Sequence, residues 1–151
     1  MTTLSETTPE QLAQLWLDTL PRVMRLVVVA GVHEANGHQL SVPQFRILKQ
    51  LSHGSRLGSE LAQTLQVTPP TISAGVDSLV RRGLVERGEA SDRRAIPLRI
   101  TPAGAHCLQT AQQRALGILT QLLERMSGPE RRALAQGLDA LARALESYSG
   151  S

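Results

Sequence analysis

Apolar residues recur at intervals of three and four along the first part of the chain, from Pro9 to about residue 36. This spacing places them on one face of a helix. They are Leu12, Leu15, Trp16, Leu20, Val23, Leu26, Val27 and Ala30. Pro21 falls inside the pattern, and because proline lacks an N–H and crowds the preceding turn, we expect a kink or two abutting helices there. The turn formers of "ANGHQLS" predict a loop over residues 35–41.

The sequence predicts two further helices, one from its capping residues and one from the spacing of its apolar residues. Ser41 with Gln44 three positions later predicts a capping box, followed by a helix that turns Phe45, Leu48 and Leu51 inward and stops at "SHGS". A short helix is expected over Ser59–Leu65, with its apolar residues on one face.

The next helix is expected to open with Thr68 as N-cap and Pro69 in the first position, and to end at Gly83. Its apolar stripe consists of Ile72, Val76, Leu79 and Val80. Two short helices joined by a tight turn, the second with a polar start, predict a helix-turn-helix. In that motif the first helix braces the second, whose N-terminal turn enters the DNA major groove.

A β-hairpin is predicted next. Residues 84–89 can form one strand, and residues 95–101 alternate Ile96, Leu98 and Ile100 on one face, the period of a half-buried strand. Pro97 cannot donate to a ladder, so this strand should lie at an edge or turn the missing donor to water. The loop "ASDRR" then holds Arg93 and Arg94 at the hairpin tip, beside the second helix.

Two long helices complete the pattern. Thr101 and Pro102 predict the start of one that runs to about Met126, "SGPE" is a break, and a last helix is expected from Pro129 to about Ser147. Both carry apolar stripes without an obvious partner in the same chain. We expect them to pair with another chain; the alternative is that they pack back on their own domain.

Composition and charge narrow the class of protein. The chain has 151 residues, 41% of them hydrophobic, with one cysteine and a net charge of +3. Residues 41–101 hold nine Arg or Lys against five Asp or Glu, so the excess positive charge lies there. That concentration favours a polyanion partner, although scattered solvated arginines would give the same count. With no apolar run of about 18 residues and no signal peptide, we expect a soluble, cytoplasmic protein without a membrane partner.

The segment from Glu60 to Gly104 resembles the DNA-binding core of MarR-type transcriptional regulators. The matching signature is a helix-turn-helix ending in "LVRRGLVER", a wing with "DRR", and "LRITPAG" leading into a long helix. The resemblance implies a mainly α fold with a small β wing. It also implies a homodimer that acts as a repressor, or less often an activator, released by a small ligand or by oxidation. The corresponding parts are a dimerisation segment over 1–40, a winged helix-turn-helix over 41–101, and dimerisation helices over 102–151.

The sequence departs from the family at two places. The recognition helix reads "TISAG" where family members often carry a base-reading Arg or Lys, so base contacts would depend on hydroxyls and water. Pro21 falls in a helix that the family usually keeps long.

Candidate DNA contacts come from the wing and from the two helix starts. The wing arginines are expected in the minor groove, with Asp92 fixing the direction of one of them, as the resemblance suggests, or serving as a turn residue. Hydroxyls and a helix N-terminus can hold phosphates, although capping alone or solvation would also explain such residues. The full set is Arg93, Arg94, Asp92, Thr68, Pro70, Thr71, Ser73, Ser55, Arg56, Ser59, Arg82 and Arg87.

Candidates for an effector site are large or ionisable residues, which are scarce in the N-terminal part of the chain. They are Trp16, Arg25, His33, His38, Phe45 and Arg46. In the resembled family the pocket lies between the dimer helices and the DNA-binding lobe. No cofactor or metal is expected, because the histidines lack metal-ligand spacing. Cys107 is either a buried small hydrophobe or, with a pKa lowered by the helix start, a redox sensor.

These observations favour a homodimeric, sequence-specific transcriptional regulator on a pseudo-palindromic operator in double-stranded DNA. An enzyme is disfavoured, because no nucleophile–base pair, carboxylate dyad or phosphate loop is visible. A winged-helix module for DNA architecture or protein contacts, without ligand control, remains the alternative.

Overall fold

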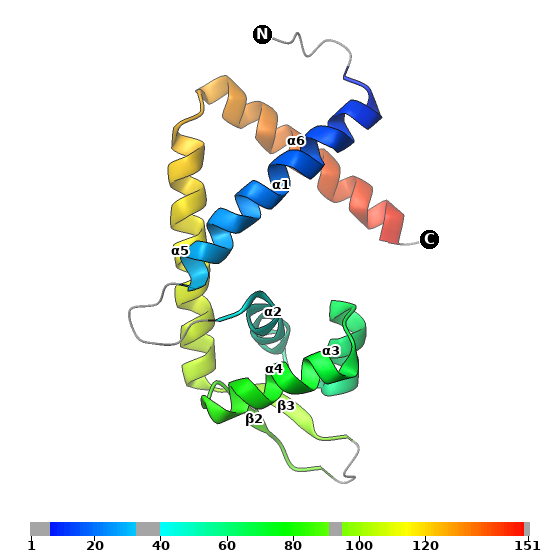
Figure 1. The fold of residues 1–151 in the computed structure, drawn as a ribbon, viewed down its shortest axis with the longest axis vertical. Coiled ribbons are helices and arrows are strands. Elements are labelled where there is room, and N and C mark those ends of the chain that lie inside the picture. Colours follow the sequence, from blue (N-terminus) through cyan, green and yellow to red (C-terminus); the bar gives the residue numbers. More distant parts are fainter. Residues whose placement is uncertain (1–6, 33–39, 91–94, 150–151) are drawn as a thin grey trace. The chain divides into compact units, whose positions relative to one another are not determined.

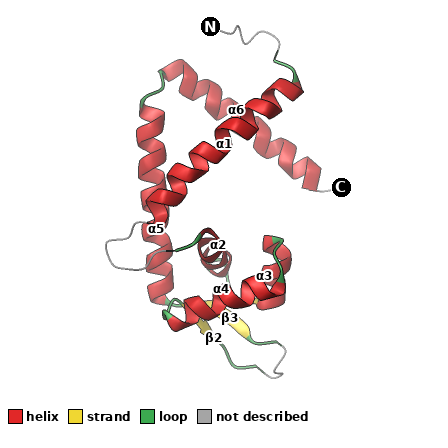
Figure 2. Cartoon of the chain, in the orientation of Figure 1, coloured by secondary structure: helices red, strands yellow, loops and turns green. Residues whose placement is uncertain are grey.

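The computed structural model describes residues 7–32, 40–90 and 95–149 (Figure 1). They form helices with a small sheet, which confirms the expected fold class (Figure 2). The elements are α1 (Pro9–Val32), α2 (Val42–Leu51), β1 (Arg56–Leu57), α3 (Gly58–Leu65), α4 (Pro69–Arg81), β2 (Val85–Arg87), β3 (Pro97–Ile100), α5 (Pro102–Glu124) and α6 (Gly128–Ser149).

The chain forms two compact units, Met1–Ala115 and Leu116–Ser151. The division falls inside α5, so the expected boundaries at residues 40 and 101 stay a prediction. None of the described helices combines the length and the apolarity that a bilayer crossing needs.

The core of the first unit lies among α2, α3, α4, the sheet and the start of α5. Its most deeply buried side chains are Ile47, Leu48, Leu51, Leu61, Leu79, Leu84 and Val85. Each is worth roughly 1.5–3 kcal/mol when fully buried. Ile72 and Val76 are buried with Leu79, which confirms the inward stripe predicted for the second helix of the motif. Cys107 also lies in this core, 5% exposed, as expected of a small hydrophobe.

The helix ends follow the local sequence signals. The backbone N–H of Gln44 donates to Ser41 Oγ at 3.3 Å and the Ser41 N–H donates to Gln44 Oε1 at 3.0 Å, so the predicted capping box is confirmed. Thr68 is the N-cap of α4, but its hydroxyl bonds the Thr71 hydroxyl at 2.9 Å instead of a backbone N–H. Gly83 follows α4 with a φ of +70°, which glycine adopts without strain.

The sheet corrects two expectations. Its strand order is β1-β3-β2, all antiparallel, so β3 with Pro97 is the central strand; of the two alternatives for Pro97 the edge placement is wrong, and the missing donor turned to water stays a prediction. Proline is tolerated because it is the first residue of β3, and its carbonyl still accepts the Gly88 N–H at 2.7 Å. The two-residue strand β1 was not predicted, and it places Arg56 in the sheet and not in the bracing helix.

The long helices follow the predicted bounds closely. α1 is one helix through Pro21, so of the two alternatives the two abutting helices are wrong and the kink stays a prediction. The Thr101 hydroxyl accepts the Gly104 N–H at 3.0 Å and donates to the Gly83 carbonyl at 2.6 Å, which joins the start of α5 to the end of α4. Most of the loop expected over residues 35–41 lies outside the described residues.

Candidate nucleic-acid interface

The outer face of α4 is polar at its N-terminal end. Pro70, Thr71, Ser73 and Ala74 are all exposed, while the opposite face of the helix enters the core. The first backbone N–H groups of a helix have no partner inside it, and the helix dipole places partial positive charge there. This end of α4 is therefore suited to contact an anionic backbone, and its hydroxyls can hydrogen-bond base edges or phosphates.

A hollow of about 240 Å³ lies beside this end of α4, between the start of α3 and the sheet. Three of the predicted contact residues line it: Ser59, Ser73 and Arg87. Ser55 and Arg56 are exposed but do not line the hollow. The structure therefore brings together the start of α3, the start of α4 and strand β2, as a winged helix-turn-helix requires.

Arg87 is tied to the recognition helix by an ion pair that sequence reasoning missed. Its guanidinium bonds the carboxylate of Asp77 on α4, and both side chains are about half exposed. The pair links β2 to α4 and thereby orients the wing relative to the recognition helix. No local sequence pattern predicts this ion pair, because Asp77 and Arg87 are ten positions apart on two different elements.

Arg82 has a different environment from the one expected. Its Nη1 donates to Gln44 Oε1 at 3.2 Å, its Nη2 is buried, and Gln44 Nε2 donates to Ser78 Oγ at 3.0 Å. The guanidinium thus braces the end of α4 against α2. This placement argues against the phosphate contact that we expected of Arg82.

Gly75 has a packing role. A Cβ at this position would lie 2.8 Å from Ile47 Cδ1, so the glycine lets α4 approach α2 closely. Of the two small residues that depart from the family pattern, only Ala74 is on the exposed face. The departure from the family pattern on the exposed face of α4 is therefore confined to one residue.

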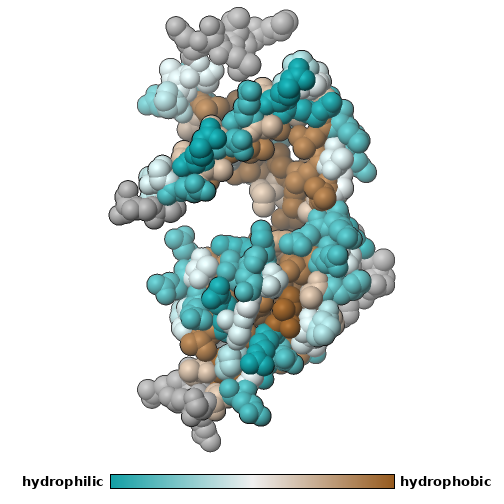
Figure 3. All heavy atoms as spheres, turned by 180° about the vertical axis from the view of Figure 1, so that it is seen from behind, coloured by the Kyte–Doolittle hydropathy of each residue, from teal (hydrophilic) through white to brown (hydrophobic). Residues whose placement is uncertain are grey.

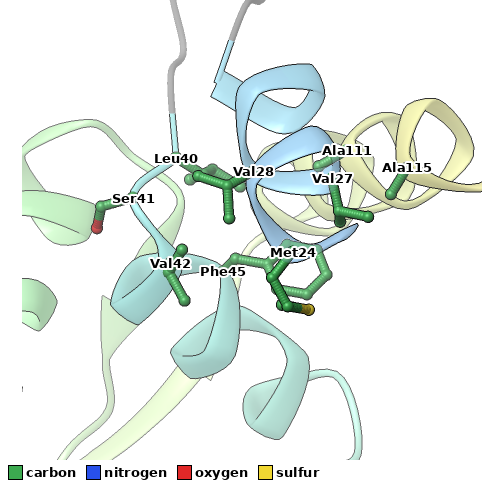
Figure 4. Close-up of a pocket in the computed structure, with 9 residues that line it drawn as sticks. All are labelled: Met24, Val27, Val28, Leu40, Ser41, Val42, Phe45, Ala111 and Ala115. Carbon is green, nitrogen blue, oxygen red and sulfur yellow. The ribbon is translucent and has the colours of Figure 1, made fainter. Parts of the chain in front are cut away.

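The wing tip lies outside the described residues, so Asp92, Arg93 and Arg94 stay predictions. His33 and His38, two of the effector candidates, also lie outside them. Trp16 and Arg25 are exposed on α1, and Arg46 donates to the Leu65 carbonyl at 3.2 Å. Of the effector candidates that the structure describes, Phe45 alone lines an apolar cavity (Figure 4). The described residues hold no group of acidic, histidine or cysteine side chains arranged for a metal ion.

Comparison with known proteins agrees with this architecture. Residues 38–95 match the sequence model of the MarR family. The chain is 27% identical over 128 residues to the HTH-type transcriptional regulator YfiV of Bacillus subtilis, covering 82% of this chain and 80% of that protein.

Solved structures share the fold. The crystal structure of RV1404 from Mycobacterium tuberculosis has a TM-score of 0.78 at 24% identity, covering 94% of this chain and 97% of that one. The apo form of E. coli MarR has a TM-score of 0.71 at 22% identity, covering 90% and 98%. The family match, the relative and the shared fold agree with the motif from Glu60 to Gly104: residues 38–95 form a winged helix-turn-helix of the MarR family, and the whole chain has the fold of the MarR-type structures.

Proposed function

We propose that the protein is a homodimeric, sequence-specific DNA-binding repressor that a small molecule releases from its operator. The observation that carries the DNA-binding part is the exposed polar start of α4, braced by α3 and α2 and flanked by the sheet. A helix presented in this way fits the major groove of B-DNA. A transcriptional regulator acts where the DNA is, so we expect it in the cytoplasm.

The proposed DNA contacts fall into two groups. At the helix starts and on the sheet beside them they are Thr68, Pro70, Thr71, Ser73, Ser55, Arg56, Ser59 and Arg87. On the wing they are Asp92, Arg93 and Arg94, with an arginine in the minor groove, where narrow A·T tracts deepen the negative potential. Arg82 is left out of this set because it is engaged with Gln44.

The terminal helices supply the surface for a second copy. On α1 the exposed apolar residues include Leu12, Leu15 and Trp16, and on α6 they include Leu134 and Leu138. Figure 3 shows apolar side chains, in brown, along the long helices. Apolar stripes left exposed on several helices are typical of a protein interface. A two-fold pair of recognition helices then requires a pseudo-palindrome with half-sites about 10 bp apart.

A mobility shift with the DNA upstream of the gene tests the proposal. Binding should survive an excess of random duplex and should weaken by on the order of a thousandfold between 50 and 200 mM salt, as expected for six or more phosphate contacts. Equal competition by random duplex would favour the architectural module. A promoter–reporter fusion then shows whether the protein represses or activates transcription. Repression predicts higher expression of the reporter when the gene of this protein is deleted.

A matched pair of substitutions tests the interface itself. Ala74→Asp puts a carboxylate on the exposed face of α4, and repulsion from phosphates should weaken operator binding by roughly a hundredfold. Ala105→Asp makes the same change at an exposed position in the first turn of α5, where a carboxylate suits the helix dipole, and should leave binding nearly unchanged. An equal effect of both variants would contradict the placement of α4 on the DNA.

A further inference from the structure

The outer face of α4 carries only short side chains over its first two turns. Ile72 and Val76 enter the core, and Gly75 packs against Ile47. The residues left exposed there are Pro69, Pro70, Thr71, Ser73 and Ala74. None of these side chains has the paired hydrogen-bonding groups with which arginine reads guanine, or asparagine and glutamine read adenine, in the major groove.

The two hydroxyls on this face do not select a base pair by themselves. Thr71 Oγ1 lies 2.9 Å from Thr68 Oγ1, so one of these hydroxyls already donates to the other. Ser73 lines the hollow beside the sheet. A serine or threonine hydroxyl can both donate and accept, and it therefore bonds the edges of different bases. The hydroxyls can contribute to binding without deciding the sequence that is bound.

The arginines of α4 and β2 are either engaged or distant from this face. The guanidinium of Arg87 is held by the carboxylate of Asp77, and Arg82, at the C-cap, donates to Gln44. Arg81 is exposed, but at a rise of about 1.5 Å per residue it lies about 18 Å from the start of α4. A guanine beneath the first two turns would thus gain no cationic partner from this helix.

The Ala74 methyl group is the remaining feature that can distinguish base pairs. Thymine presents a 5-methyl group in the major groove, and apolar contact with alanine is one of the ways in which it is read. We propose that α4 selects T·A pairs through the thymine 5-methyl group, with Ala74 as the specificity-determining residue. This inference rests on the proposed function, because it needs the start of α4 in the major groove, and it names the base pairs that α4 selects.

Two base analogues in the operator fragment test the readout. Deoxyuridine in place of thymidine removes the 5-methyl groups and keeps the base pairing, whereas 7-deazaguanine removes the N7 acceptor of guanine. Both changes lie in the major groove, so the minor-groove contacts proposed for the wing keep their base edges. Deoxyuridine should weaken binding by about tenfold, the scale of one buried methyl group in each half-site, and 7-deazaguanine should weaken it less. No loss with deoxyuridine, or an equal or larger loss with 7-deazaguanine, overturns the proposal.

A pair of glycine variants assigns the readout to Ala74. Ala74→Gly removes the methyl group from α4, and the ratio of affinities for the thymine and uracil fragments should fall toward one. Ala105→Gly makes the same change at an exposed position of α5 and should keep the ratio near ten. The ratio compares two DNAs on the same protein, so a general loss of helix stability does not alter it.

A second variant keeps the assignment testable if Ala74→Gly fails to fold. Glutamine is a good helix former, and Ala74→Gln should likewise lose the difference between thymine and uracil because its polar amide replaces the methyl contact. A ratio that stays near ten in the Ala74 variants overturns the role of this residue.

The outcomes separate this inference from the proposed function. Operator binding that is specific but indifferent to deoxyuridine overturns the thymine readout and leaves the proposed function standing. Failure to bind the unmodified operator fragment counts against the proposed function itself, and the thymine readout is then wrong as well.

Discussion

At the scale of single residues, Gly104 sets how closely α5 approaches the sheet. It is buried in the first turn of α5, and a Cβ there would lie 2.0 Å from the Leu84 carbonyl oxygen and 2.9 Å from Ile100 Cγ1. The same carbonyl accepts the Thr101 N–H at 3.1 Å. A methyl group at Gly104 would therefore collide with a backbone atom that is already held in place.

Gly104→Ala should lower the free energy of unfolding by at least about 1–3 kcal/mol, the usual cost of overpacking a well-packed core. Gly117→Ala is the control in the same helix. Nothing lies within 4 Å of a Cβ there, so alanine should stabilise the helix by roughly 0.5–1 kcal/mol. Urea unfolding of both variants checks the difference. Equal stability of the two variants would mean that α5 does not pack on the Leu84 carbonyl.

For single residues, the sequence predicts which side chains of α4 face the core, but not which residues contact α2. Ile72, Val76 and Leu79 were predicted to face inward because helical periodicity depends on the chain alone. Arg82 was predicted to contact DNA, and the packing role of Gly75 was not predicted. Their environment depends on where α2 crosses α4, which no spacing along the chain encodes.

At the scale of elements, helix starts were predictable and strand neighbours were not. A capping box such as Ser41 with Gln44 lies within four residues, so the signal is local. The place of Pro97 in the sheet depends on β1, which comes from a distant part of the chain and is too short to show any alternation. The continuity of α1 through Pro21 was likewise not predicted, because a proline inside a helix signals an interruption from the local sequence alone.

The start of α6 is also a capping box, and its stability depends on pH. Glu130 Oε2 accepts the N–H and the hydroxyl of Ser127, both at 2.7 Å, and these bonds hold the pKa of Glu130 below its ordinary value. A carboxylate whose pKa is lowered by folding stabilises the folded state above its unfolded pKa, about 4.3. That stabilisation is lost as the pH falls through the folded-state pKa.

Glu130→Gln should therefore be less stable than the parent at pH 7, and the difference should shrink as the pH is lowered below 4. Glu146→Gln removes an exposed carboxylate near the other end of α6 and serves as the control. Chemical denaturation at pH 7 and pH 3 measures both effects. A Glu130→Gln deficit that persists undiminished at pH 3 would show that the ionised carboxylate is not what caps α6.

At the scale of the whole molecule, the unit Leu116–Ser151 exposes an apolar stripe on α6. Leu134, Leu138 and Leu145 are exposed at intervals of four and seven, and Leu141 between them is half-buried. The sequence alone predicted that such stripes need a partner, because unpaired apolar faces can be recognised from periodicity. It could not identify the partner surface, because complementarity between two copies depends on their packed shapes.

Leu138→Glu tests whether that partner is a second copy. The side chain is 51% exposed, so the monomer should tolerate the change, whereas two carboxylates brought into a two-fold apolar interface would be desolvated without partners. Light scattering should show the mass fall from dimer to monomer, and operator binding should fall with it because a single recognition helix reaches one half-site. Gln136→Glu adds the same charge on the opposite side of α6 and should leave both properties intact. A Leu138→Glu protein that remains dimeric would remove α6 from the interface and leave α1 as the surface that holds the two copies together.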